Sequence, residues 1–427
     1  MSMDLLAIIL FLVAIILAFV RHVNIGIVAL AMGVICVRIF GLTDKNLISG
    51  ISSGMFCTLV GITLLFAIIK QTGALDLLAK KIVSSTGNRV WLLPITIYIA
   101  GFVIAGVGPG AIPALAIIPA LAVTTAIQVR YDPLMLALIG EFGLMAGRMT
   151  SITPEAAIIT NAATSAGIGD VMPTVLACQT LVTFVYGIVV FFVFKGYKLK
   201  APKQNLTDTK LPSFTRDQIL SLLGIPLMLL LMIGFKVNIG LAAFFASAVL
   251  VLCGVAKDGE ALKALPWSTI IMVVAVGALL GVVNKVGGIK LMSNAISSIM
   301  TSSTAVPLMG ISAGLLSLLS LVSSALAVVY PTMMPMCPDI AAQVGSVSPV
   351  ALMAAVGGGG SLAGLSPMST GGALILAALG TNLDNFTSTQ QTKVFVKLLI
   401  FAGGALVLLA IISALTYGPI ANMLYHG

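Results

Sequence analysis

The chain has 427 residues, of which 59% are hydrophobic and 8% are charged, and its formal net charge is +9. About a quarter of the residues in a soluble domain are charged, so this composition excludes a soluble protein. The positive charge is concentrated in loops between apolar segments and is therefore no sign of nucleic-acid binding.

Long apolar runs with few charges recur along the chain and predict an all-α, polytopic membrane protein, because about 20 such residues cross the hydrocarbon core as a helix. In the first half we expect crossings at 4–20, 23–40 and 54–70, an amphipathic interfacial helix at 74–86, a re-entrant hairpin over 90–128, a helix over 133–166 that is broken at 147–154, and a crossing at 171–195. The hairpin adds no net crossing, so this half crosses five times.

The sequence is internally repeated. Val-Asn-Ile-Gly begins at Val23 and again at Val237, and the match between the halves continues, at an offset of 214 to 216, to Thr153 and Ser369. We therefore predict a first repeat at 1–200, a linker at 201–216 and a second repeat at 217–427. Because each repeat crosses an odd number of times, the second is inverted relative to the first.

Basic residues favour one orientation in a cell (inner) membrane. Sixteen of the 22 Lys and Arg residues fall on the side that includes the linker at 196–216, and five fall on the other side. Loops rich in Lys and Arg stay in the cytoplasm. The linker is therefore predicted to be cytoplasmic, with both termini outside.

Four breaks in apolar segments are the candidate site, because unwound backbone at membrane depth survives only inside protein or beside a water-filled cavity. Two are hairpin tips, at Gly108-Pro109-Gly110 and Ser323-Ser324-Ala325. Two are helix breaks, at 147–154 and 364–372. The alternative, that these glycines only let helices pack closely, stays open.

Hydroxyls and freed backbone groups at the breaks can replace the hydration shells of a carboxylate and a cation. The predicted substrate-binding residues are Arg148, Thr150, Ser151, Thr153, Ser323, Ser324, Ser366, Ser369 and Thr370. The predicted cation-coupling residues are Gly108, Gly110, Glu141, Gly147, Ala325 and Gly364. Half-helix N-termini favour anions, and freed carbonyls suit Na+.

Three charges lie near the first helix break, at Glu141, Arg148 and Glu155. Charges inside a membrane are costly and usually functional. Arg148 is a candidate to bind a substrate carboxylate through a fork of two hydrogen bonds, and Glu141 or Glu155 is a candidate to carry a proton. The alternative is a buried pair of Glu141 and Arg148, two helical turns apart, that only neutralises itself.

Three stretches resemble the MatC-type malonate/dicarboxylate carriers of the ion transporter superfamily, which are related to the divalent-anion/sodium symporters. They are TLVGITLLFAIIKQTGALDLLAKKIV, AGVGPGAIPALAIIPALAV and GLSPMSTGGALILAALG. The resemblance is clearest over 1–155 and returns at 364–380. The Ser-Pro-x-Ser element of the family matches at Ser366–Ser369, whereas the symporters' Ser-Asn-Thr is absent from both hairpin tips.

The resemblance implies a secondary active transporter of a C3 or C4 dicarboxylate such as malonate, coupled to Na+ or H+, and not an enzyme. It also implies a homodimer with scaffold parts at about 1–89 and 217–304, and transport parts at about 90–195 and 305–427 that slide as an elevator. No cofactor is expected. The alternatives are the membrane subunit of a tripartite carboxylate transporter, a gluconate-type or arsenite-type permease of the same superfamily, a channel, and an intramembrane enzyme, for which no catalytic constellation exists in the sequence.

Overall fold

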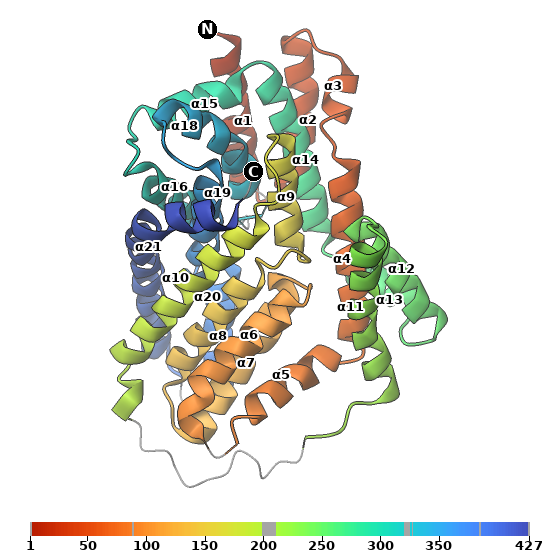
Figure 1. Cartoon of the computed structure of the whole chain (residues 1–427), viewed down its shortest axis with the longest axis vertical. Coiled ribbons are helices and arrows are strands. Elements are labelled where there is room, and N and C mark those ends of the chain that lie inside the picture. The colour runs from red at the N-terminus through yellow and green to blue at the C-terminus, as the bar shows by residue number, and fades with distance from the viewer. Residues whose placement is uncertain are drawn as a thin grey trace.

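The computed structural model describes residues 2–87, 89–198, 211–319, 325–326, 328–383 and 386–425. Over these residues the chain is helical and contains no strand, as predicted. The N- and C-terminal ends both lie in the upper half of Figure 1, and α5 and the lower ends of α7 and α8 lie at the opposite end. Within the described ranges, seven helices are long and apolar enough to cross a membrane, and six further apolar helices of 10–17 residues accompany them.

The helices of the first half follow the apolar runs of the sequence. In chain order they are α1 (Met3–Val20), α2 (Ile25–Ile39), α3 (Asp44–Ile48), α4 (Ser53–Gln71), α5 (Ala74–Ser84), the 3-10 turn η1 (Val90–Leu92), α6 (Leu93–Gly106), α7 (Ala111–Val129), α8 (Pro133–Gly147), α9 (Pro154–Ser165), α10 (Met172–Val193) and the 3-10 turn η2 (Gly196–Lys198). The helix ends predicted around the hairpin tip and the helix break are confirmed.

The helices of the second half follow nearly the same order. They are α11 (Arg216–Gly234), α12 (Ile239–Leu252), α13 (Asp258–Lys263), α14 (Trp267–Lys285), α15 (Gly288–Ser297), α16 (Ala305–Leu319), α17 (Val329–Met333), η4 (Met334–Met336), α18 (Cys337–Val344), α19 (Pro349–Leu362), η5 (Ala363–Leu365), α20 (Thr370–Asn382) and α21 (Ser388–Leu424). The short helices α3 and α13 were not predicted.

One group of helices, α1 to α4 and α11 to α14, packs through reciprocal close contacts between the two halves. A Cβ added to Gly240 on α12 would lie 2.6 Å from the Cα of Thr58 on α4, and one added to Gly26 on α2 would lie 2.7 Å from the Cα of Met272 on α14. Gly26 and Gly240 are 214 residues apart, and so are Thr58 and Met272. The two contacts are therefore equivalent, and each half supplies the glycine in one contact and its partner in the other. Such close backbone contact requires glycine and is typical of helix packing in membranes.

A second group contains the hairpin and broken helices. In the first half, α6 and α7 pack against α8, and in the second half α16 packs against α19. The long helices α10 and α21 pack against each other and join the two halves. The amphipathic helices α5 and α15 connect the groups, since α5 contacts α6 and α15 contacts α18. Figure 1 shows α5 at the lower end of the molecule and α15 at the upper end.

The two halves differ in the second arm of the hairpin. In the first half this arm is the continuous, 19-residue helix α7, whereas in the second half it is divided into α17, η4 and α18. The divided arm contains Pro331, Pro335 and Pro338, each of which lacks an N–H for a helical hydrogen bond, but α7 is continuous through Pro119, so the prolines alone do not account for the division.

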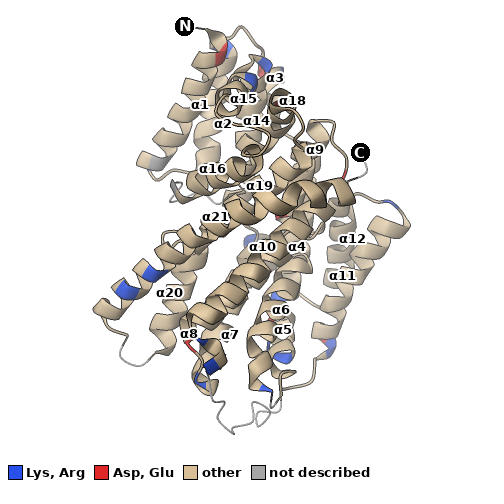
Figure 2. Ribbon diagram, turned by 60° about the vertical axis from the view of Figure 1, so that its left-hand side comes forward, with Lys and Arg blue, Asp and Glu red and all other residues tan. Residues whose placement is uncertain are grey.

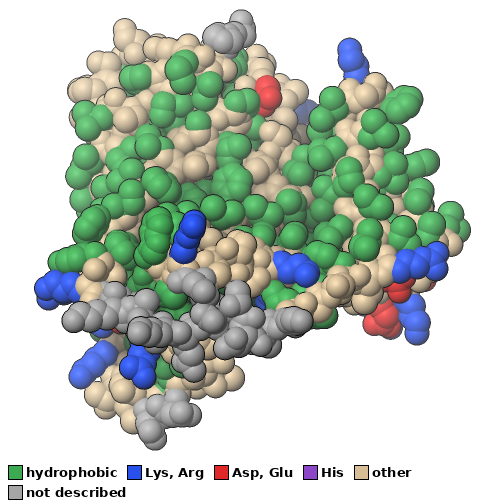
Figure 3. All heavy atoms as spheres, turned by 60° about the horizontal axis from the view of Figure 1, so that its bottom comes forward, with side chains coloured by type: hydrophobic (Ala, Val, Ile, Leu, Met, Phe, Trp, Pro, Cys, Tyr) green, Lys and Arg blue, Asp and Glu red, His purple; other side chains and the backbone are tan. Residues whose placement is uncertain are grey.

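The basic side chains gather at the end of the molecule away from the N-terminus. Figure 2 shows most Lys and Arg residues in the lower half of the ribbon. Figure 3 looks onto that end, where Lys and Arg side chains rim a surface that is otherwise largely apolar and carries few acidic groups. The side predicted to be cytoplasmic is therefore one end of the folded molecule.

Candidate functional site

The first helix break is a short turn between α8 and α9, closed by a threonine. The hydroxyl of Thr153 donates hydrogen bonds to the carbonyls of Arg148 at 2.6 Å and Thr150 at 3.0 Å. The same oxygen accepts the N–H of Ala156 and so caps α9. The hydroxyl of Thr150 donates to the carbonyl of Gly106 at the end of α6, which ties the break to the hairpin.

The second helix break, between α19 and α20, is closed in the same way. The hydroxyl of Ser369 donates to the carbonyls of Gly364 and Ser366. At an offset of 216, these three residues correspond to Thr153, Arg148 and Thr150. Hydroxyls predicted to contact the substrate therefore donate to backbone carbonyls in both breaks, which satisfies acceptors that the unwinding leaves free.

The buried charges at the first break form an ion pair that the sequence analysis did not single out. Nε of Arg148 lies 3.3 Å from Oε1 of Glu155, and the two side chains are 9% and 2% exposed. The alternative prediction, that Arg148 pairs with Glu141, was wrong, because Arg148 pairs with Glu155. Arg148 keeps helical backbone angles at the end of α8, and the turn that follows brings Glu155 back to its side chain.

Glu155 also binds the tip of the first hairpin. Its Oε1 accepts the N–H of Ala111, the first residue of α7, at 3.0 Å. The preceding residue, Gly110, has φ +69° and ψ −155°, a conformation essentially restricted to glycine. Its missing side chain makes room for Glu155, because a Cβ there would lie 2.3 Å from Oε2. A carboxylate at a helix N-terminus is electrostatically favourable.

A second buried carboxylate lies beside the N-terminus of α20. Glu141 is 2% exposed, and a Cβ added to Gly371 in the first turn of α20 would lie 2.5 Å from its Oε1. Gly371 corresponds to Glu155 at the offset of 216, so a carboxylate lies at the first turn of both α9 and α20, and both carboxylates come from the first repeat. Among the described residues, Oε2 of Glu141 has no hydrogen-bond partner.

A cavity of about 730 Å³ lies between the two groups of helices, on the side of α3, α14, α9 and α18. Its lining is part polar and part apolar, and the polar residues include Asp339 as well as Ser52 and Asn161, whose side chains form a hydrogen bond of 3.3 Å. Asn284, Ser49 and Ser53 also line it and are exposed.

A smaller cavity of about 110 Å³ lies on the other side of the same helices, and Glu155, Ala111 and Pro109 line it from the hairpin tip. From α4 it is lined by Leu59, Thr63, Phe66, Ala67 and Lys70, and at an offset of 214 these correspond to Val273, Gly277, Leu280, Gly281 and Asn284 of the larger cavity. The two cavities are thus equivalent places in the two repeats, one wide and one narrow.

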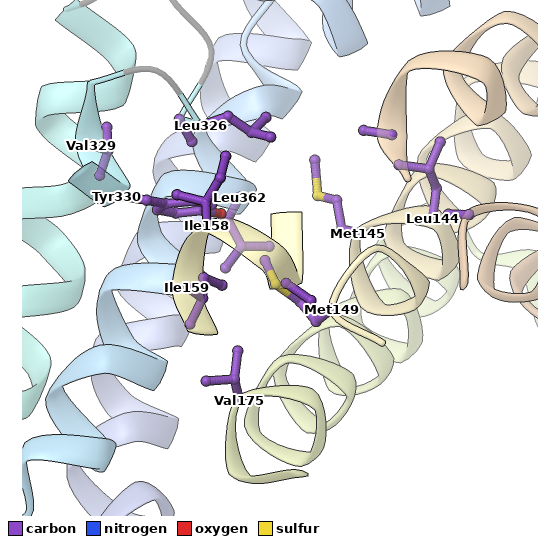
Figure 4. Close-up of a cluster of buried hydrophobic side chains, with 14 of the residues drawn as sticks. Leu144, Met145, Met149, Ile158, Ile159, Val175, Leu326, Val329, Tyr330 and Leu362 are labelled. Atoms are coloured by element: carbon purple, nitrogen blue, oxygen red, sulfur yellow. The ribbon is translucent and has the colours of Figure 1, made fainter. Parts of the chain in front are cut away.

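The layer between the cavities is thin and apolar, because Ile158 and Val273 line both. Figure 4 shows Ile158 beside Tyr330, Leu326 and Leu362 in a buried apolar cluster close to Met145 and Met149 of the first break. The hydroxyl of Tyr330 donates to the carbonyl of Gly357 at 3.1 Å, which attaches the second hairpin to α19.

The structure brings part of the predicted site together. Arg148, Thr150 and Thr153 lie at the first hairpin tip with Gly108 and Gly110, while Glu141 lies by the second break with Gly364. Ser151 and Thr370 are exposed, Ser366 and Ala325 are buried, and Gly147 packs on the carbonyl of Phe102. Ser323 and Ser324 lie outside the described residues.

Four cavity residues were not predicted from the sequence: Lys70, Asn161, Ile158 and Val273. Lys70 and Asn161 were detectable as polar residues in apolar segments. No sequence signal marks Ile158 or Val273, because isoleucine and valine are common throughout the chain.

Comparison with known proteins supports the predicted family. Residues 1–148 match the family model described as dicarboxylate carrier protein MatC N-terminus. This match confirms the resemblance to the MatC-type dicarboxylate carriers. A comparison with curated proteins finds no match.

Two solved structures are similar in fold. The YdaH transporter of Alcanivorax borkumensis, described as having an unusual topology, matches with a TM-score of 0.59 and 13% identity over 88% of this chain and 87% of that one. MtrF of Neisseria gonorrhoeae, described as illuminating a class of antimetabolite efflux pumps, matches with a TM-score of 0.60 and 16% identity over 97% and 95%. With the apolar helices and the family match, this fold supports a multi-pass membrane transporter and not an enzyme.

Proposed function

We propose that this chain, whose first 148 residues match the N-terminal region of the MatC dicarboxylate carriers, is a secondary active transporter of small dicarboxylates such as malonate. The family match supports the substrate class. The buried guanidinium of Arg148 and the N-terminus of α7 supply the cationic group and the amide that a carboxylate needs when it leaves water.

The observation that carries the proposal of a carrier is the pair of equivalent cavities with unequal volumes, about 730 Å³ and about 110 Å³. A channel needs a continuous path, whereas here Ile158 and Val273 separate the two. A second conformation, with the smaller cavity wide and the larger one narrow, would give the substrate access from the other side.

We propose that the halves are inverted repeats of five crossings each and that the exchange of cavities occurs by an elevator motion. The reciprocal contacts of Gly26 and Gly240 support the two-fold relation between the repeats. The scaffold comprises the parts at 1–89 and 217–304, and the moving body comprises those at 90–195 and 305–427. A homodimer in the cell (inner) membrane, with the linker in the cytoplasm and both termini outside, completes the proposal.

Transport is coupled to Na+ or to H+. For Na+, the candidate ligands are backbone carbonyls and hydroxyls at the hairpin tips and breaks, which are hard oxygen donors. For H+, the candidate is Glu141, which is buried and has no hydrogen-bond partner for Oε2 among the described residues.

Uptake of labelled malonate into proteoliposomes tests the proposal. We expect saturable uptake that depends on an inward gradient of Na+ or H+ and is inhibited by other C3 and C4 dicarboxylates. Uptake that does not saturate would indicate a channel. No uptake or binding of any dicarboxylate, by protein that elutes as a homogeneous oligomer, would contradict the proposed function.

A further inference from the structure

Glu155 is bound in the way that a carboxylate substrate would be bound. Its Oε1 lies 3.3 Å from Nε of Arg148 and accepts the N–H of Ala111 at 3.0 Å. Ala111 begins the 19-residue helix α7, so the carboxylate lies at a positive helix end. A guanidinium, a backbone amide and a helix N-terminus together are the usual components of a carboxylate receptor.

Glu155 satisfies this receptor only in part. Oε2 of Glu155 is buried without a hydrogen-bond partner among the described residues. Nε of Arg148 is likewise without a hydrogen bond there, because its contact with Glu155 has the distance of an ion pair but not hydrogen-bond geometry. A carboxylate that is free to orient can instead form the parallel pair of hydrogen bonds that a guanidinium favours.

We infer that Glu155 is an internal stand-in for the substrate: it occupies the carboxylate receptor of Arg148 and Ala111 while the site is empty, and one carboxylate of the substrate displaces it. This inference rests on the proposed function. It assigns Glu155 a role in competition with the substrate, which a purely structural ion pair would not have.

The neighbouring cavity provides the path for this exchange. Glu155 and Ala111 line the cavity of about 110 Å³, which has room for roughly three or four water molecules at about 30 Å³ each. Lys70 is the basic residue in its lining. There it balances the second carboxylate of the substrate or the displaced side chain of Glu155.

The second repeat has no equivalent stand-in. At the offset of 216, Gly364 replaces Arg148 and Gly371 replaces Glu155. The carboxylate of Glu141 lies against Gly371, but within the described part of the chain it forms no ion pair with a guanidinium. The described residues thus contain this receptor once, at the first break.

Calorimetry of malonate binding tests the inference with a matched pair of variants. Glu155→Gln removes the competing charge, and its amide oxygen can still accept the N–H of Ala111. Glu260→Gln removes an exposed carboxylate on α13, outside the site, and leaves the receptor as it is. We expect Glu155→Gln to bind malonate about tenfold more tightly or better, since a charge-assisted hydrogen bond contributes at least that factor. Glu260→Gln should stay within about threefold of wild type.

The possible outcomes are distinct. Unchanged or weaker binding by Glu155→Gln would show that Glu155 only positions Arg148, and equal tightening in both variants would show general charge repulsion. Glu155→Asp is the second variant if Glu155→Gln does not elute as the native oligomer. It keeps the charge but is one methylene too short to reach Ala111, so it should also bind malonate more tightly than wild type. Weaker binding would contradict the inference. If wild-type protein takes up malonate normally but the Glu155 variants do not bind malonate more tightly, this inference alone is overturned. If wild-type protein neither binds nor takes up malonate, the proposed function is overturned.

Discussion

Arg148 pairs with Glu155, seven residues after it across the helix break, and not with Glu141, seven residues before it. In a continuous helix both carboxylates would stand two turns from the guanidinium. The turn at 148–153 changes the direction of the chain, so that Glu155, which binds the hairpin tip, lies beside the side chain of Arg148. The pair therefore joins three elements, α8, α9 and α7, at one point.

Substitution of Arg148 should weaken substrate binding. Arg148→Ala removes a charge-assisted interaction of about 1.5–3 kcal/mol, which is roughly a ten- to hundredfold loss of affinity for a dicarboxylate. Arg148→Lys should also be impaired, because an ammonium does not reproduce the fork of a guanidinium. Calorimetry on variants that elute as the native oligomer measures the effect. Unchanged affinity in Arg148→Ala would mean that the arginine only neutralises its partner.

The hydroxyls that close the two breaks should contribute to stability as well as to binding. Thr153→Val keeps the shape of the side chain but leaves the carbonyl of Arg148 without its hydroxyl donor, while the carbonyl of Thr150 keeps the N–H of Thr153. Ser369→Ala does the same at the carbonyl of Gly364, while that of Ser366 keeps the N–H of Ser369. Each unsatisfied buried acceptor costs about 1–3 kcal/mol, so both variants should lower the Tm of the detergent-solubilised protein. Ser151→Ala, at an exposed position of the first break, is the control, and an equal loss of Tm there would contradict the prediction.

A cross-link between the two groups of helices should stop transport. Oγ of Ser52 and Oδ1 of Asn161 lie 3.3 Å apart across the larger cavity. Cysteines at both positions, in a cysteine-free background, should form a disulfide that abolishes malonate uptake until a reductant is added. Asn24 and Ser268, whose side chains lie 2.7 Å apart within the proposed scaffold, are the control pair. Full uptake with the first pair oxidised would exclude movement of α9 relative to α4.

The coupling cation can be identified with Glu141→Gln. If Na+ binds to neutral oxygens at the breaks, uptake at fixed pH should require Na+ and survive this substitution. If H+ is coupled through Glu141, uptake should not depend on Na+ and should be abolished by Glu141→Gln. Counterflow, which needs no net ion movement, should persist in either case, and its loss would show that Glu141 is required for the fold or for binding.

The proposed orientation predicts the reactivity of a native thiol. Cys253 at the end of α12 is the one cysteine of the chain that is exposed, and it is close in sequence to Lys257 on the side predicted to be cytoplasmic. A membrane-impermeant maleimide should label it only after permeabilisation. A cysteine at the exposed Ser49, in a Cys253→Ser background, should react in intact cells. The opposite pattern would invert the topology.

Local sequence signals predicted the helices and their breaks well, because glycine and proline interrupt apolar runs at these places. The division of the second hairpin arm into α17, η4 and α18 had no such clear signal, because α7 runs unbroken through Pro119. The partner of Arg148 was not predictable, because it depends on the path of the turn after Gly147. The cavities depend on how segments more than 200 residues apart meet, which spacing within one segment does not reveal.

The thin layer of Ile158 and Val273 has an electrical consequence. If water and ions fill both cavities, they conduct, so most of the voltage across the membrane falls over the layer that separates them. One elementary charge carried through the full potential changes in energy by about 2.3 kcal/mol per 100 mV. A charged group that moves only a few ångströms past Ile158 would therefore experience nearly the whole potential, and a short displacement of Glu155 or of a bound dianion would register as a large gating current.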